Sequence, residues 1–104
     1  MNQNKEKYLH VYAHAEEVGE SFLDMVLKEA EKTAFDPKTH ELAYLAVLVA
    51  TRLEHGIVMH TKQAKKLGAT RDEIKSAALV ALPVVGFPAI MGLKTALNSY
   101  DEEI

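Results

Sequence analysis

Residues 36–74 decide the fold of this chain and read DPKTHELAYLAVLVATRLEHGIVMHTKQAKKLGATRDEI. Asp36 and Pro37 suit the cap and first turn of a helix, since the amide hydrogen that proline lacks has no helical partner there. The apolar run that follows has no polar side, so we expect a largely buried helix from Lys38 to Thr51. We predict a break near Arg52 to Gly56, because glycine is a weak helix former.

Helices are expected on both sides of this stretch. An apolar stripe at three- and four-residue steps predicts the first helix, in which Gly19 marks a kink or a close contact. Further along, Gly68 suits a left-handed cap, Thr70 and Glu73 form a capping box, and Pro83 ends a helix. The sequence therefore predicts an all-α fold, a helical bundle of about five to six helices. The expected helices besides that of residues 38–51 are Lys5–Thr33, the segment after the break up to Leu67, Arg71–Leu82 and Pro88–Tyr100.

Length and composition restrict the class of protein. A chain of 104 residues is expected to form a single domain, residues 1–104. Its 48% apolar residues exceed what so small a core needs, which favours self-association. The net charge of -3 and the lack of a basic stripe argue against nucleic-acid binding. Because cysteine is absent, disulfides, thiolate metal sites and thiol peroxidase chemistry are excluded.

The uncharged segment from Ser76 to Leu93 is barely long enough to span a bilayer. Two prolines and two glycines interrupt it, so we interpret it as a buried helix–loop–helix and expect no membrane span. Residues 1–7 are polar and lack the apolar core of a signal peptide. We therefore expect a cytoplasmic protein.

Three ionisable side chains are candidates for chemistry: Glu41, His55 and His60. His60 falls on the apolar stripe of its helix, His55 lies at the mouth of that helix, and Glu41 lies in the first turn of the preceding one. Each also has a purely structural interpretation. His60 could be a hydrogen-bonded core histidine, His55 a solvated histidine and Glu41 a carboxylate that stabilises the helix dipole. On one straight helix Glu41 and His60 would stand about 28 Å apart, so a proton relay requires the chain to reverse between them.

A metal site is a separate hypothesis. His10 and His14 stand four residues apart, with Glu17 about one turn beyond. On one helix this spacing places the three side chains near one face, where two imidazoles could chelate zinc or nickel. The alternative is a solvated helix face, which such spacing produces more often.

From Asp36 to Leu97 the chain resembles the carboxymuconolactone decarboxylase family, which includes the AhpD-like alkylhydroperoxidases. Redox members of that family carry Cys-x-x-Cys ahead of a motif histidine, and Leu53 and Gly56 occupy those two positions here. The residues that carry the resemblance are Glu41, His55, His60, the turn Gly68-Ala69-Thr70, the pair Glu73-Ile74 and the turn Gly86-x-Pro88.

The resemblance implies an AhpD-like helical bundle that forms a homotrimer or a hexamer of paired trimers, with no metal or organic cofactor. It implies that Glu41 and His60, with His55, shuttle a proton to or from a small carboxylated lactone or related acid. Arg52 is the nearest residue that could hold a substrate carboxylate, although a surface arginine is the commoner interpretation.

Two alternatives remain open. The loss of both sulfurs could mark an oligomeric scaffold or binding protein of the same family without catalysis. A peroxidase-related activity follows from family similarity only, because disulfide cycling needs cysteine thiols and this chain has no cysteine.

Overall fold

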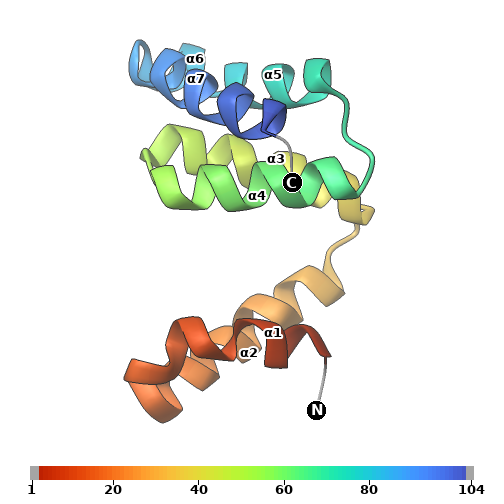
Figure 1. Cartoon of the computed structure of the whole chain (residues 1–104), viewed down its shortest axis with the longest axis vertical. Coiled ribbons are helices and arrows are strands. Elements are labelled where there is room, and N and C mark those ends of the chain that lie inside the picture. The colour runs from red at the N-terminus through yellow and green to blue at the C-terminus, as the bar shows by residue number, and fades with distance from the viewer. Residues whose placement is uncertain (1–2, 103–104) are drawn as a thin grey trace. The chain divides into compact units, whose positions relative to one another are not determined.

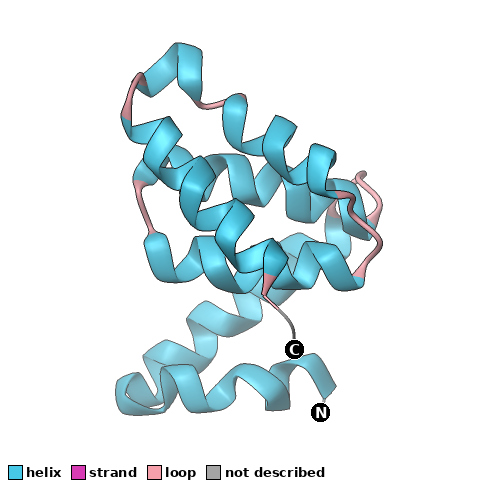
Figure 2. Cartoon of the chain, turned by 45° about the horizontal axis from the view of Figure 1, so that its top comes forward, coloured by secondary structure: helices cyan, strands magenta, loops and turns pink. Residues whose placement is uncertain are grey.

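A computed structural model describes residues 3–102 as helices joined by short turns (Figures 1 and 2). No strand occurs within that range, so the predicted all-α fold class is confirmed. The chain divides into two compact units, Met1–Ala34 and Phe35–Ile104. The single domain expected from the sequence stays a prediction. None of the helices between residues 3 and 102 combines the length and apolarity needed to cross a bilayer.

The first unit is a pair of packed helices, whereas the sequence indicated a single helix. The single helix expected from Lys5 to Thr33 is wrong, because the chain leaves the α-helical path just before Glu16, whose φ is 54°. Gly19 explains the fold-back, since a Cβ there would overlap the carbonyl oxygen of Tyr12. The expected close contact at this glycine is therefore present. The elements are α1 (Gln3–Tyr12), a 3-10 turn η1 (Ala13–Ala15) and α2 (Glu16–Lys32).

The second unit has two layers (Figure 1). Helices α3 and α4 lie side by side in one layer, and α5, α6 and α7 form the other. The fourth helix ends at Leu79 rather than at the expected Leu82, and Pro83 lies inside the short helix α6, where the first turn tolerates proline. The elements are α3 (Pro37–Thr51), α4 (Glu54–Lys66), α5 (Arg71–Leu79), α6 (Leu82–Val85) and α7 (Pro88–Asp101).

The chain reverses between α3 and α4, as predicted. Arg52 takes a left-handed conformation, with φ 61° and ψ 35°, and the amide of Leu53 donates to the carbonyl of Leu48 at 3.1 Å. This hydrogen bond satisfies a carbonyl group at the end of α3 that would otherwise lack a partner. Gly56 is not at the break; it lies in the first turn of α4, where it lets Leu48 approach closely.

Helix α3 is the centre of the second unit, but it is not buried on all sides. It packs against α4, α5 and α7, with a smaller contact to α6, and these helices cover one face. The opposite face stays open in the single chain, and Val47 there is 62% exposed. The expected central position of a largely buried helix is therefore present, with one face left uncovered within one chain. The buried core consists of Leu45, Leu48, Val49, Ile57, Ala64, Ala69, Ile74, Ala77, Ala78, Ala81, Ala89 and Ala96.

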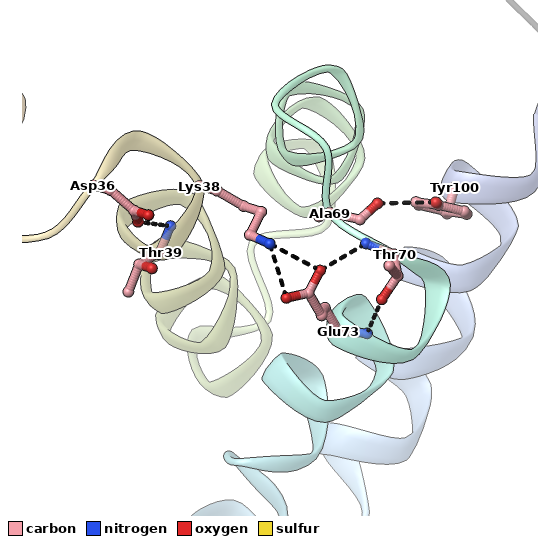
Figure 3. Close-up of polar contacts among 7 residues, drawn as sticks. All are labelled: Asp36, Lys38, Thr39, Ala69, Thr70, Glu73 and Tyr100. Carbon is pink, nitrogen blue, oxygen red and sulfur yellow. Dashed lines mark hydrogen bonds and ion pairs between the residues drawn. The ribbon is translucent and has the colours of Figure 1, made fainter.

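Polar contacts fix the starts of α3 and α5 (Figure 3). Asp36 caps α3 by accepting from the amide of Thr39 at 2.8 Å. Thr70 and Glu73 form the predicted capping box of α5, with reciprocal bonds of 3.1 and 2.9 Å. The ammonium of Lys38 reaches the same Glu73 carboxylate at 3.1 Å, which ties the two helix starts together.

Helix α7 closes the second unit against α3 and α4. Gly92 lies directly against Val49 of α3, so closely that a side chain would not fit without movement. At the other end, the Tyr100 hydroxyl donates to the carbonyl oxygen of Ala69 at 2.9 Å, as Figure 3 shows. This bond holds the last turn of α7 to the loop that precedes α5.

Candidate functional site

The reversal at Arg52 brings Glu41 of α3 and His60 of α4 into contact. Glu41 Oε2 lies 2.7 Å from His60 Nδ1. The Glu41 side chain is 15% exposed and that of His60 27% exposed, so solvent can still reach the pair. Partial burial strengthens such a contact relative to a fully solvated one. The two residues that the sequence analysis joined are thus hydrogen-bonded.

The contact fixes which nitrogen of His60 can react. When Glu41 is ionised its carboxylate can only accept, so the ring proton is placed on Nδ1 and Nε2 carries the lone pair. A carboxylate that holds Nδ1–H also stabilises the imidazolium that forms when Nε2 takes up a second proton. The arrangement can therefore act as a general base or a general acid through Nε2.

An aromatic side chain that the sequence analysis missed completes this cluster. The Tyr44 ring stacks on the imidazole of His60, with ring centroids 4.0 Å apart and planes inclined by 12°. The His40 ring meets Tyr44 edge-on, at 6.1 Å and 65°. Tyr44 lies one turn after Glu41, so both face α4 from the same side of α3. That three-residue spacing is the signal from which the sequence could have indicated its role.

The other two candidates lie away from this cluster. His55 is exposed, and five residues place it about 140° around α4 from His60 at 3.6 residues per turn. Arg52 donates from Nε to Glu54 at 3.2 Å, and its Nη1 lies 3.6 Å from the sulfur of Met91. Both contacts are those of a surface arginine. The structure brings neither side chain to the Glu41–His60 pair.

The metal hypothesis relied on a continuous helix, and the chain is interrupted there. His10 lies in α1, His14 in η1 and Glu17 in α2, so four-residue spacing no longer places them on one helix face. Across residues 3–102, no group of three His, Cys, Asp or Glu side chains is placed to hold a metal ion.

An open apolar groove of about 650 Å³ lies on a different face of α3 from the Glu41–His60 pair. It runs between α3 and α5, and neither Glu41 nor His60 lines it. Its acidic rim consists of Asp72 and Glu73, the second of which is already bonded to Lys38. The groove is therefore a surface separate from the candidate site.

The sequence of this chain matches a family model over most of its length. The model described as Carboxymuconolactone decarboxylase family matches residues 16–98, well over half of the chain. The chain belongs to the carboxymuconolactone decarboxylase family. The matched region contains both helices that supply Glu41 and His60. Searches of curated proteins and of solved structures found no match.

Within the carboxymuconolactone decarboxylase family, this chain lacks the sulfur of the redox members. The two positions that the sequence analysis matched to their cysteines are Leu53, at the cap of α4, and Gly56, in its first turn. Leu53 is 56% exposed, and a Cβ at Gly56 would come within 2.8 Å of a methyl group of Leu48. Leu48 packs where a side chain at residue 56 would stand, so this chain's packing is adapted to glycine.

Proposed function

We propose that this member of the carboxymuconolactone decarboxylase family is a cofactor-free acid–base enzyme that acts on a small carboxylated lactone or a related acid. The observation that carries the proposal is the 2.7 Å contact between His60 Nδ1 and Glu41 Oε2 in a half-buried position. Enzymes place such pairs where a proton must be taken up and returned during one turnover. Family membership supports the substrate class.

The proposed step needs only these two side chains. The carbon–carbon bond to the leaving carboxylate breaks, and its electron pair moves into the neighbouring carbonyl to give an enolate. Carbon dioxide departs, and the imidazolium of His60 donates its Nε2 proton to the α-carbon. Glu41 stabilises the imidazolium before transfer and keeps the neutral ring in the Nδ1–H form afterwards. His60 then regains a proton from solvent.

The test is carbon dioxide release or ring opening on a panel of carboxylated lactones and β-keto acids. We expect His60→Gln and Glu41→Gln to lower turnover by about a hundredfold or more, the usual contribution of a positioned acid or base. Glu54→Gln is the matched control, because it removes an exposed carboxylate that pairs with Arg52. Unchanged turnover in His60→Gln would remove the pair from the mechanism.

The second candidate function is an oligomeric scaffold, supported by apolar side chains that remain exposed on the single chain. Val84 is 81% and Phe87 70% exposed, and together with Val47 they leave apolar surface of the kind that proteins cover by association. We propose self-association to a homotrimer or a hexamer of paired trimers. A monomer in sedimentation at micromolar concentration would contradict it. Peroxidase activity has no cysteine thiol to support it, and a cytoplasmic location stays a prediction.

A further inference from the structure

We propose that Tyr44 is a positioning residue for His60, whose ring it holds in one plane so that proton exchange occurs at Nε2. This inference rests on the proposed acid–base function and adds a third residue to it. The stack is close and nearly parallel, with centroids 4.0 Å apart and an interplanar angle of 12°. Aromatic rings at this separation attract one another beyond simple burial.

The hydrogen bond to Glu41 does not by itself fix the imidazole. A single contact at Nδ1 leaves the ring free to tilt about the line that joins the two atoms, because the terminal torsion of histidine is broad. The Tyr44 ring removes this freedom by covering one face of the imidazole. With Nδ1 occupied and one face covered, the edge that carries Nε2 is the part of the ring left for a substrate proton.

Tyr44 is itself well placed to act as a rigid support. It is partly buried and packs against the hydrophobic core of the second unit. His40 meets its ring edge-on from the preceding turn of α3. Glu41 comes from the same two turns of that helix, so the carboxylate and the supporting ring move together as one body relative to α4. Any shift between α3 and α4 would then disturb both contacts at once.

The competing explanation is that Tyr44 only fills core volume beside His60. Two substitutions separate the two roles. Tyr44→Phe keeps the ring and therefore the stack, whereas Tyr44→Leu keeps apolar bulk and loses the ring. A volume role predicts similar behaviour for both variants. A positioning role predicts that Phe behaves as the natural protein does and that Leu does not.

The primary measurement is NMR of the His60 ring, which requires no substrate; His60→Gln assigns its signals. In the natural protein and in Tyr44→Phe, we expect the carbon-bound protons of the His60 ring to resonate upfield of those of exposed His14, because of the ring current of residue 44. We also expect the His60 nitrogens to show the chemical shifts of the Nδ1–H form. In Tyr44→Leu the protons should move downfield and their signals should broaden as the ring tilts, while the nitrogen shifts stay those of the Nδ1–H form because Glu41 still accepts that proton. Tyr12→Leu, which removes a ring from the first unit, is the control and should leave His60 unchanged.

The kinetic measurement separates this inference from the proposed function. On any substrate that is turned over, Tyr44→Leu should lower kcat by up to about a hundredfold with little change in KM, and Tyr44→Phe should retain it, because misplacing a reacting group by about 1 Å has effects of that size. If no lactone or keto acid is turned over, the proposed function fails while the NMR result still decides the stack.

The stack can also be tested without any variant, so a Tyr44→Leu protein that fails to fold does not remove the test. Cross-relaxation between the ring protons of Tyr44 and His60 in the natural protein is expected at this distance. Its absence, or His60 signals that are the same in folded Tyr44→Leu and in Tyr44→Phe, would overturn the inference.

Discussion

The contact between Gly92 of α7 and Val49 of α3 allows a sharp thermodynamic prediction for Gly92→Ala. The new Cβ would lie 2.7 Å from Val49 Cγ1, where ordinary contact begins at 3.4 Å, a deficit of about 0.7 Å. Rotating Val49 gives little relief, since its second methyl group, Cγ2, already lies 3.4 Å away and its side chain is fully buried. Overpacking of this kind costs about 1–3 kcal/mol.

Helix propensity acts in the opposite direction, because alanine is favoured over glycine inside a helix by about 1 kcal/mol. We therefore expect Gly92→Ala to lower the free energy of unfolding by about 1 kcal/mol. Val49→Ala alone should cost roughly 2 kcal/mol through lost burial and a cavity. In the Val49→Ala background the 2.7 Å clash with Cγ1 is removed and only the tight contact with Cβ at 3.3 Å remains, so Gly92→Ala should become neutral or stabilising by up to about 1 kcal/mol.

The measurement is equilibrium urea unfolding of the four proteins of this double-mutant cycle, followed by circular dichroism at one fixed protein concentration. We expect a coupling energy of about 1–2 kcal/mol between the two sites, above the error of additive pairs. Ile57→Ala is the control partner, because Ile57 is equally buried but lies outside the contact around Gly92. Additive effects of Val49→Ala and Gly92→Ala, within about 0.5 kcal/mol, would refute the reasoning.

Three further predictions concern the second unit. Thr61→Val should raise the free energy of unfolding by about 1–2 kcal/mol, because the fully buried hydroxyl has no hydrogen-bond partner among residues 3–102; a lower melting temperature would contradict this. Gly68→Ala should cost about 1 kcal/mol in urea unfolding, since φ there is 96°, and an unchanged midpoint would argue against strain. Hydrogen bonds from the backbone amide of Thr70, and next from Lys38, lower the pKa of Glu73. The folding stability that this shift contributes is fully present above the pKa that Glu73 has in the unfolded chain. It is lost as pH falls through the lower pKa that Glu73 has in the folded protein. In a plot of the urea midpoint against pH, Glu73→Gln should therefore reduce the fall of the midpoint at acid pH. An unchanged fall would exclude this role of Glu73.

Helix ends were predictable from the sequence where their signals are local. The Asp36 cap with Pro37 and the Thr70–Glu73 capping box each lie within four residues, and both are present as predicted. The break in the first helix was missed because residues 13–15 carry neither glycine nor proline and the apolar stripe continues across them. The one sequence signal is Gly19, which lies after the turn. Glycine is needed there because α2 folds back so closely that a side chain would overlap Tyr12.

The acid and the base of the candidate site were predictable from the sequence, but the supporting ring of Tyr44 was not. Glu41 and His60 stand out as ionisable groups beside apolar runs, and the reversal that joins them was anticipated. It occurs at Arg52, a residue whose left-handed conformation has no local sequence signal, rather than at Gly56. A tyrosine in an apolar helix, by contrast, usually indicates a core residue, and the three-residue spacing from Glu41 was the one sequence signal that Tyr44 faces the imidazole.

The two-residue connection between α3 and α4 has a consequence for how the site arises. Glu41 and His60 are only 19 positions apart, so joining them requires the closure of one short loop and no pairing between distant parts of the chain. The acid and the imidazole can consequently meet at an early stage of folding, before α7 docks.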